Sequence, residues 1–501
     1  MCAMRVNDLI VKKPWLRVLP DGYMSGGVCT ADSVPAMSVT PPLYGVVSQS
    51  DFLREYYPSG HRIHDPLFYP DIYREETVPV TDENGMETGR YTRRIYKEKV
   101  PRCSFAFQRV IGVKQIVHLC GNDIQFELLK ESPDAEETSD FSQLTDGWQL
   151  KNMECAFYEV ARSSKITGDG AIVGYLDGGR FGWKHFSFLE GDILYPHYGP
   201  TGELDVFARR FRDLDENGDV VTDWLEVFDE RKYYLFRRDA AGNSFVRRLF
   251  HLDGWKLVRE KEHGFMFVPV AYRRNEEGGC WSFSQGSIEG YEVAFSQMVH
   301  NNQAYGFPIL YFQGENTEIG HGMDGTIKTL TMGPDDKAGY LTAQSASEAF
   351  MTQLETLYKK IYEDSFTVIP PDVKSGDLPA AALKILYSPA YEKAMTDSHD
   401  YQMFLDSLVR IFCYGYGVEV GKSANFGSLP LKSWIKPYVH VSESTMVADL
   451  ATAVQNGFAS RQTASERISF YTSASEWDRI MRENKTTNDA VKEPQSRETP
   501  L

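Results

Sequence analysis

The sequence predicts an α+β protein with more than one structural unit. Two segments with helical periodicity, at about 287–305 and 345–361, enclose a short region of strand-like runs. Residues 171–258 contain many short apolar runs separated by turn residues, a pattern typical of an antiparallel sheet. A chain of 501 residues is too long for one core, and its length indicates about three domains.

The first of the two helical segments extends from about Ser287 to Tyr305. Its apolar residues recur at i, i+3, i+7 and i+10, which places them on one face of a helix. Pro308 prevents the helix from continuing, because proline lacks an amide hydrogen and its ring clashes with the preceding turn. The apolar face consists of Ile288, Tyr291, Phe295 and Met298.

The second helical segment begins at a capping box formed by Ser345 and Glu348. Each helix of some 20 residues spans roughly 30 Å at the usual rise per residue. Two such helices that leave a body and return to it are expected to need neighbours for their apolar faces. The periodicity alone favours the alternative, a helical hairpin buried in an ordinary core. The second apolar face consists of Phe350, Leu354, Leu357, Tyr358 and Ile361.

Short strands are expected between the two helices, at 309–312, 326–332 and 339–342. The segment after the second helix is too rich in Pro and Gly to be helical, and a loop is expected there.

Upstream, residues 1–45 show no periodicity and are expected to form an extended arm. Ser48 and Asp51 predict the start of a short helix that ends near Tyr57, and residues 82–85 (DENG) predict a hairpin turn. A helix is expected over 141–164, ended by Gly168. The strands expected after it are 171–176, 183–188, 193–195, 206–211, 224–228, 233–236, 245–250 and 255–258.

Downstream, a long helix is expected from near Pro389 to the glycines at 415 and 417, followed by a strand over 436–441. Residues 446–454 predict a helix stopped by Gly457, and a further helix follows Ser460 and extends toward Arg482. Residues 483–501 have almost no apolar side chains and are expected to be a disordered tail.

The composition excludes several classes of protein. With 42% hydrophobic and 25% charged residues the chain is globular, and no apolar run approaches the ~18 residues of a membrane helix. The first residues lack the pattern of a secretory signal. Seven scattered cysteines without a C-x-x-C pair argue against disulfides and structural zinc, and favour a reducing place of assembly. A net charge of −17 argues against tight nucleic-acid binding, although DNA could slide along such a surface.

No local motif predicts chemistry. Residues 415–423 (GYGVEVGKS) resemble a phosphate-binding loop, but Tyr416 stands where the first glycine is required. Residues 213–218 match half of a calcium loop, but Trp224 occupies the position of its bidentate glutamate, so a polar hairpin tip is expected. The histidines have no metal-binding spacing, and neither a metal nor a cofactor is expected. A glycosidase carboxylate pair has no local signature here, so it stays open.

The order of the elements resembles the portal proteins of tailed double-stranded-DNA bacteriophages, the siphophage-type head-tail connector family. The likeness covers roughly residues 45–485 and depends on element order more than on any one string. Five segments carry it in the family's order: 56–61 (YYPSGH), 166–177 (ITGDGAIVGYLD), 263–270 (HGFMFVPV), 375–394 (SGDLPAAALKILYSPAYEKA) and 456–464 (NGFASRQTA).

The resemblance implies a division of the chain into parts. Residues 1–45 are an N-terminal arm that matches nothing in the family, and 46–285 form a mixed α/β wing. The stem helices are 286–306 and 345–365, with a small clip at 307–344 between them. The remaining parts are the tunnel loop and start of the tunnel helix at 366–388, the wing return at 389–442, the helical crown at 443–484 and the tail at 485–501.

The resemblance also implies a non-enzymatic function. Family members form rings, dodecameric in the virion, at the unique capsid vertex through which the genome is packaged and later ejected. The implied partners are identical copies of the chain, the terminase large subunit, the head-completion adaptor, the major capsid and scaffolding proteins, and transiently bound DNA, without any membrane. Assembly in the host cytoplasm follows from the same likeness.

Two sets of residues follow from this assignment. The stem faces are expected to pack on adjacent subunits through Ile288, Tyr291, Phe295, Met298, Phe350, Leu354, Leu357 and Ile361. The DNA channel is expected to be lined near the tunnel loop by Asp372, Lys374, Asp377 and Lys384. Two other functions stay open: a carbohydrate-active hydrolase, which predicts turnover and a monomer, and another minor head or baseplate protein, which predicts an assembly without an axial channel.

Overall fold

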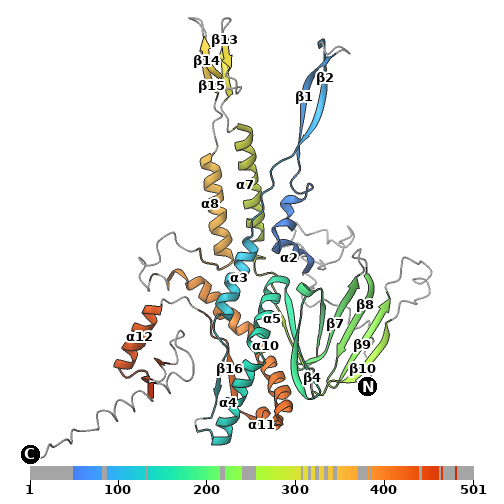
Figure 1. The fold of residues 1–501 in the computed structure, drawn as a ribbon, viewed down its shortest axis with the longest axis vertical. Coiled ribbons are helices and arrows are strands. Elements are labelled where there is room, and N and C mark those ends of the chain that lie inside the picture. The colour runs from blue at the N-terminus through green and yellow to red at the C-terminus, as the bar shows by residue number, and fades with distance from the viewer. Residues whose placement is uncertain are drawn as a thin grey trace, which may run out of the picture. The chain divides into compact units, whose positions relative to one another are not determined.

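A computed structural model shows how the elements are arranged (Figure 1). It describes residues 49–81, 87–130, 132–214, 220–239, 255–305, 309–313, 318–321, 327–331, 337–341, 347–369, 382, 385–438, 443–461, 464–465 and 480–481. The chain divides into two compact units, Met1–Thr367 with Glu392–Tyr438, and Val368–Tyr391 with Val439–Leu501. Helices and antiparallel sheets occupy separate stretches of the chain, which confirms the predicted α+β class.

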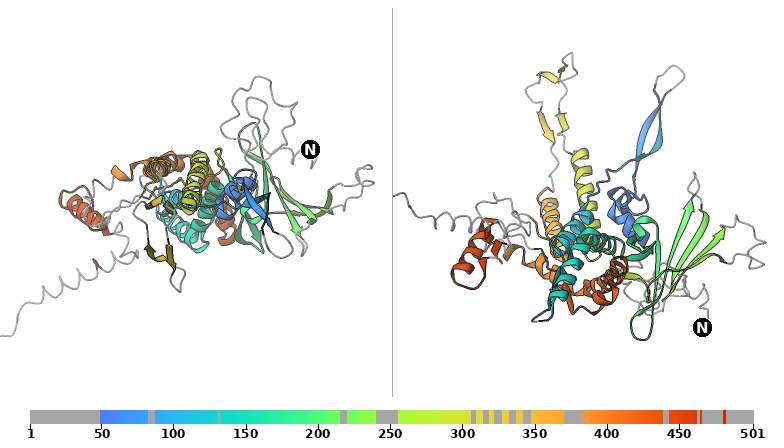
Figure 2. Two further views of the ribbon diagram at one scale, coloured as in Figure 1. Left: turned by 90° about the horizontal axis from the view of Figure 1, so that it is seen from above. Right: turned by 60° about the horizontal axis from the view of Figure 1, so that its bottom comes forward.

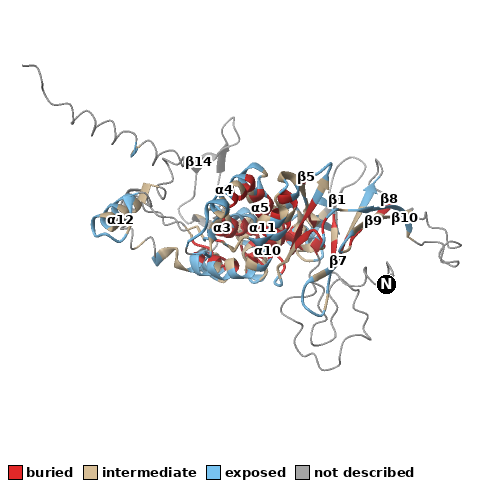
Figure 3. Ribbon diagram, turned by 90° about the horizontal axis from the view of Figure 1, so that it is seen from below, coloured by how far each residue is buried: buried red, intermediate tan, exposed pale blue. Residues whose placement is uncertain are grey.

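The main core of the first unit lies where its helices meet (Figure 3). Met153, Phe157, Leu405 and Phe412 are among its fully or almost fully buried side chains. The helices that enclose it are α3 (Phe107–Cys120), α4 (Ala135–Leu150), α5 (Met153–Thr167), most of α10 (Ser388–Val420) and α11 (Ser423–Ser428).

The single helix expected over 141–164 is wrong, because α4 and α5 are separate helices. Asn152, between them, adopts a left-handed conformation with φ 54°, which neither helix can contain. Gly168 ends α5 with φ 91°, as expected. Helix α4 begins at a capping box in which Asp134 and Glu137 each accept a hydrogen bond from the other's backbone amide.

Two separate sheets replace the one expected between residues 171 and 258. Strand β4 pairs with β5 on one side and with β11, which the sequence did not predict, on the other, in the order β11-β4-β5. The other five strands form an antiparallel meander in the order β10-β9-β8-β7-β6, and the strand expected at 245–250 lies outside the described residues. The bounds are β4 Asp169–Asp177, β5 Arg180–Phe186, β6 Ile193–Tyr198, β7 Leu204–Leu214, β8 Val220–Phe228, β9 Lys232–Asp239, β10 Lys256–Glu262 and β11 Val270–Arg274.

Two predictions made from the sequence are wrong near the end of the first unit. Helix α10 continues through Gly415 and Gly417 to Val420, and it ends at Gly421, whose φ is 74°. The described strand of this region is β16 (Leu431–Trp434), which pairs with β3 (Gln125–Leu128). Residues 436–438 of the expected strand are not in a strand, and 439–441 lie outside the described residues.

Helices α2, α7 and α8 are the other α-helices in the described part of the first unit. Helix α2 (Gln49–Tyr56) precedes two short 3-10 turns, Pro58–Gly60 and Arg62–His64. Helices α7 (Gln285–Tyr305) and α8 (Ser347–Asp364) lie side by side, as the two views of Figure 2 also show. Their bounds agree with the two predicted helices, although Ser345 of the expected capping box lies outside the described residues.

Short strands separate α7 from α8, and a longer hairpin precedes α3. The short strands pair as β12 with β15 and β13 with β14, and β13 was not predicted. Strands β1 (Ile72–Thr81) and β2 (Glu87–Glu98) form an isolated antiparallel ribbon, as the turn signal at 82–85 indicated. The short strands are β12 Ile309–Gln313, β13 Glu318–His321, β14 Ile327–Thr331 and β15 Lys337–Leu341.

The second unit contains α12 (Glu443–Gln455), followed by Gly457 with φ 74°, close to the helix and stop expected there. Most of the helix expected beyond Ser460 lies outside the described residues. In the described part of the chain, no helix combines the length and apolar character needed to cross a membrane.

Candidate functional site

Helices α7 and α8 are held together at their bases by apolar and polar contacts. Ile288 and Ile361 have no exposed surface, and Leu354 is 6% exposed. The Ser284 hydroxyl donates a hydrogen bond of 3.0 Å to the carbonyl oxygen of Ile361, which joins the start of one helix to the end of the other. Gly290 of α7 faces Leu357 of α8, where a Cβ would lie at an ordinary contact distance of 3.8 Å. The pair is therefore fixed to its own chain at this end.

An aromatic cluster packs α7 and α8 against the start of α3. The ring of Phe105 lies 5.2 Å from that of Tyr291 and 5.0 Å from that of Phe295, both edge to face. Phe107 contacts Tyr291 at 5.2 Å and Tyr358 at 6.0 Å. Edge-to-face contacts of this kind add about 0.5–1.5 kcal/mol per pair to the effect of burial. The cluster thus uses the aromatic residues of both helical faces within one chain.

A buried polar network joins α7 to the segment after α2. The Nδ1 atom of His61 lies 2.6 Å from Oε1 of Glu292, and both side chains are only 2% exposed. The same carboxylate oxygen accepts a 2.9 Å hydrogen bond from the backbone amide of Phe105. Burial alone would lower the pKa of His61, but the hydrogen bond and charge of Glu292 outweigh it and raise that pKa. The contact joins the segment after α2 to α7 and restricts the position of α7.

Glu55 extends this network toward Trp281. The indole nitrogen of Trp281 donates a 2.9 Å hydrogen bond to the Glu55 carboxylate, and the Glu55 carbonyl oxygen lies 2.7 Å from Nε2 of His61. Burial raises the pKa of Glu55 to about 7, even though the Trp281 hydrogen bond opposes the shift. Its side chain changes charge near neutral pH at the base of the α7–α8 pair.

The structure places the eight predicted packing residues in two groups. Ile288, Leu354 and Ile361 are buried by the chain itself, so the expectation that the helical faces have no partners in one chain is wrong for these three. The other five are only partly buried and keep surface that a neighbouring copy could cover. They are Tyr291, Phe295, Met298, Phe350 and Leu357.

The predicted channel-lining residues lie outside the described part of the chain. These are Asp372, Lys374, Asp377 and Lys384. The structure therefore does not test the prediction that these four residues line a channel.

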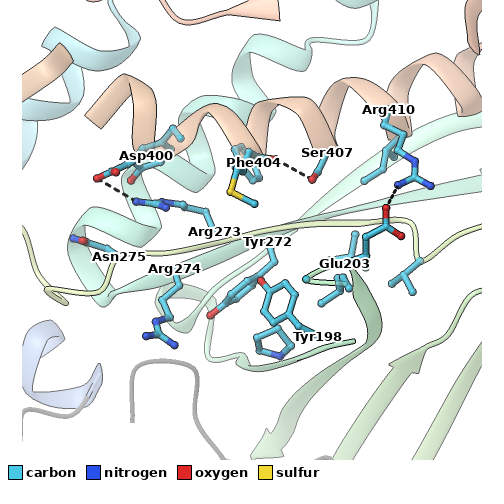
Figure 4. Close-up of a pocket in the computed structure, with 18 of the residues that line it drawn as sticks. Tyr198, Glu203, Tyr272, Arg273, Arg274, Asn275, Asp400, Phe404, Ser407 and Arg410 are labelled. Atoms are coloured by element: carbon cyan, nitrogen blue, oxygen red, sulfur yellow. Dashed lines mark hydrogen bonds and ion pairs between the residues drawn. The ribbon is translucent and has the colours of Figure 1, made fainter. Parts of the chain in front are cut away.

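A cavity of about 830 Å³ lies between α10 and the sheets of the first unit (Figure 4). Two ion pairs lie among its lining residues: Arg273 lies 3.8 Å from Asp400, and Arg410 lies 3.8 Å from Glu203. Arg273 also stacks over the ring of Tyr401, with 4.6 Å between the guanidinium carbon and the ring centroid. Asp205 and Glu230 also line the cavity, so these two ion pairs do not decide whether a glycosidase carboxylate pair is present.

A buried ion pair lies at the inner end of this cavity. Nζ of Lys165 is 2.6 Å from Oδ2 of Asp397 and 3.1 Å from the side-chain oxygen of Gln115. Burial alone would lower the pKa of Lys165, but the charge of Asp397 outweighs it and raises the pKa. This lysine is therefore a structural cation that joins α5 to α10.

Carboxyl groups with raised pKa values lie elsewhere and bind neighbouring side chains. Burial raises the pKa of Asp192 to about 6, although Arg209 donates to it at 2.8 Å. Burial also raises the pKa of Glu154, which accepts from the Trp148 indole at 2.9 Å. Neither group, nor Glu55, lines the cavity among the residues that the structure describes. The described residues also contain no cluster of three or more His, Cys, Asp or Glu able to hold a metal ion.

The two motif-like strings have structural explanations. Residues 415–423 cover the end of α10 and the start of α11, so the required strand before a phosphate loop is absent from this described segment. A Cβ at Gly415 would lie 2.2 Å from the Phe181 ring, which explains the glycine by close packing. Trp224 lies in β8, which pairs antiparallel with β7, and it donates a 2.6 Å hydrogen bond to Asp213 near the end of β7. The tip itself, 215–219, is outside the described residues.

Several residues that fix the α7–α8 pair could not be predicted from the sequence. His61 and Glu292 are 231 positions apart, and no local pattern connects them. Phe105 and Phe107 are close together in the sequence, but no helix was predicted there, so their packing against α7 and α8 was not predicted either. The sequence signal for Glu292 is a glutamate on a helix face whose other residues are apolar.

Taken together, these features describe a pair of long helices, α7 and α8, fixed at its base to a mixed α/β body. The chain matches the family model described as "Phage portal protein, SPP1 Gp6-like" over residues 49–490. It therefore belongs to the SPP1 Gp6-like family of phage portal proteins, whose members are structural components of the phage particle.

Other comparisons add less. No curated protein sequence matches the chain. One chain from the solved structure titled "Neck of empty GTA particle computed with C6 symmetry" is similar, with 11% identity and a TM-score of 0.39. The alignment covers 75% of this chain and 89% of that chain.

Proposed function

We propose that identical copies of this chain form a closed ring, a dodecamer, at the unique vertex of a phage capsid. Double-stranded DNA enters the capsid through the ring during packaging and leaves through it during ejection. The observation that carries this proposal is the family match, which covers residues 49–490 and includes both helices of the α7–α8 pair. The ring is a component of the virion, and its copies assemble in the host cytoplasm.

Within this proposal the chain has the parts that its family resemblance implies. Residues 46–285 and 389–442 form the wing, α7 and α8 form the stem, and 307–344 form the clip. The tunnel loop lies within 366–388, the crown within 443–484, and the arm and tail are 1–45 and 485–501. The clip binds the terminase large subunit during packaging and then the head-completion adaptor. The major capsid and scaffolding proteins contact the outer part of the ring.

Some of the stem residues pack within one copy, and others contact adjacent copies. Ile288, Leu354 and Ile361 hold α7 to α8 within one copy, since they have almost no exposed surface left. The partly exposed Met298 and Phe350 then contact adjacent copies. Apolar surface hidden between copies contributes about 25 cal/mol per Å² before the cost of ordering. A heterologous contact of this kind closes into a ring when its rotation is a simple fraction of a turn.

The channel is proposed to contact DNA through the tunnel loop. At least one of Lys374 and Lys384 touches phosphates transiently, and Asp372 and Asp377 beside them limit how tightly DNA is held. The net charge of −17 supports a channel that lets DNA pass without retaining it. Particles assembled with Lys374→Ala and Lys384→Ala are expected to package DNA more slowly or to a shorter length. Packaging at the normal rate and length would refute this assignment of the lysines.

The ring is proposed to have no enzymatic activity, with ATP hydrolysis supplied by a separate terminase. Residues 415–423 lack the first glycine of a phosphate-binding loop, which supports a separate ATPase. The alternatives make different predictions: a carbohydrate-active hydrolase works as a monomer with turnover, and another minor head or baseplate protein lacks an axial channel. Electron microscopy of the purified protein distinguishes them, because open rings support the portal and compact single particles support the hydrolase.

A further inference from the structure

The cavity between α10 and the sheets of the first unit has exposed apolar side chains in its wall. Met266 is 80% exposed, Met403 77% and Tyr198 49%, and all three line the same space of about 830 Å³. Exposed apolar groups that gather at one hollow mark an interaction site, and methionine adapts its shape to irregular apolar partners. The cavity therefore offers a surface to a ligand with apolar side chains.

The charges of the cavity exclude one class of ligand. Its described lining includes five lysine or arginine residues and seven aspartate or glutamate residues. An anion such as DNA or a phosphate group would meet excess negative charge, and each of the five cations already has a carboxylate within 4 Å. A ligand without negative charge fits this lining better. The five ion pairs are Lys165 with Asp397, Arg273 with Asp400, Arg274 with Glu276, Lys393 with Asp397, and Arg410 with Glu203.

The described chain begins beside this cavity. Gln49, the first described residue, is buried, and its side-chain amide donates a 2.7 Å hydrogen bond to Oδ1 of Asp169. The hydroxyl of Tyr272, in the cavity wall, donates to Oδ2 of the same carboxylate at 3.4 Å. Asp169 is also the partner of Arg274 in the pairing of β4 with β11. The residues before Gln49 are therefore attached at the β11 wall, where Figure 4 shows Tyr272 and Arg274.

The segment before Gln49 has the composition that the cavity requires. Residues 33–48 (SVPAMSVTPPLYGVVS) contain no charged side chain, and seven of them are Val, Leu, Met or Tyr. Three are prolines, and proline-rich segments bind grooves lined by aromatic rings, of which this cavity has several. The six residues 43–48 span up to about 20 Å when extended, so Leu43 and Tyr44 can reach the cavity from Gln49.

We propose that residues 33–48 of each copy bind in the cavity of the same copy, with Leu43 and Tyr44 against Met266 and Met403. The attachment at Gln49 makes this binding intramolecular, so a weak contact suffices because the effective concentration is high. The segment then joins the sheets to α10. This inference concerns a single copy and does not depend on the proposed ring. A cavity filled in this way is closed to a carbohydrate, so the same result would argue against the hydrolase alternative.

Photo-crosslinking in the full chain tests the placement. A benzophenone amino acid replaces Tyr44, or Tyr23 as the control, because Tyr23 also precedes Gln49 but lies outside the proposed segment. After irradiation and digestion, the expected product joins position 44 to a peptide containing Met266 or Met403, at a yield at least tenfold above that from position 23. Links from position 44 to other regions, or no excess over position 23, would overturn the proposal.

The mass of the crosslinked protein shows which copy supplies the segment. A link within one copy leaves the monomer mass on a denaturing gel, whereas a link to another copy gives the mass of a dimer. The proposal predicts the monomer mass for the product from position 44. A product found mainly at the dimer mass would place the segment in a neighbouring copy and overturn the proposal as stated.

Methionine oxidation gives an independent measurement. In the double variant Leu43→Ser, Tyr44→Ser, hydrogen peroxide is expected to oxidise Met266 and Met403 at least fivefold faster than in the wild-type chain. Met351, which is 51% exposed on α8, is the internal control and should react at one rate in both chains. Circular dichroism of the variant controls for folding. Equal oxidation of Met266 and Met403 in the two chains would contradict the docking, whether or not the copies form a ring.

Discussion

Replacing Glu55 with glutamine is predicted to stabilise the protein above neutral pH and to have little effect in acid. Glu55 lies in the buried network at the base of α7, where it accepts a hydrogen bond from Trp281 that glutamine can also accept. Burial raises its pKa from 4.5 to about 7, which means that the folded state disfavours the ionised carboxylate. Glutamine keeps the shape of the side chain but cannot ionise.

The sign and size of the effect follow from linkage between protonation and folding. A carboxyl group with a raised pKa contributes stability that is complete below its unfolded value and is lost as pH rises through its folded value. A shift from 4.5 to about 7 corresponds to about 3 kcal/mol at pH well above 7. The wild-type chain should therefore lose about 3 kcal/mol relative to Glu55→Gln between about pH 4.5 and pH 8.5.

Urea unfolding of both chains across this pH range measures the difference in unfolding free energy. Glu419→Gln is the matched control, because Lys151 and the Phe181 amide outweigh the effect of burial and lower the pKa of Glu419. Its contribution is complete above the unfolded value, so that variant should be destabilised by a constant amount from about pH 5 to 8.5. A difference between wild type and Glu55→Gln that does not change with pH would refute the reasoning.

Three further predictions concern packing. Asp397→Asn should destabilise the first unit by about 3–5 kcal/mol in urea unfolding, because it leaves the buried Lys165 without its counter-charge; a loss below about 1 kcal/mol would contradict the buried pair. Gly415→Ala should lower the stability by about 1–3 kcal/mol through overpacking, whereas Gly286→Ala, in open space on α7, should raise it by about 0.5–1 kcal/mol; equal effects in thermal unfolding would refute the packing argument. Leu354→Asp should prevent ring formation without unfolding the sheets, since it separates α7 from α8; unchanged assembly by native mass spectrometry would count against this placement.

The sequence predicted the projecting helices well because their apolar residues repeat with one period on one face. Helix α3 was missed for the opposite reason. Its apolar residues lie on all sides, with Ile111 and Leu119 buried but Val113 and Val117 almost half exposed, so no single stripe appears. The division between α4 and α5 depends on one left-handed residue, Asn152, a residue type that adopts this conformation more readily than most. That asparagine was the available signal.

Long-range pairing accounts for the other errors. Strand β16 is defined by its partner β3, about 300 positions earlier, and a four-residue run gives too little pattern to locate either strand alone. The His61–Glu292 pair could not be predicted from the sequence either, because both residue types are common on protein surfaces. The burial of Ile288 and Ile361 within one chain could not be foreseen either, since periodicity identifies an apolar face but not the molecule that covers it.

The central claim is that copies of this chain close into a ring around an axial channel. Cryo-electron microscopy of the purified protein, over a range of concentrations, tests it most directly. The account predicts closed rings with an open centre, in which the α7–α8 pairs of adjacent copies lie beside one another. A population that remains monomeric at the highest concentration would contradict it.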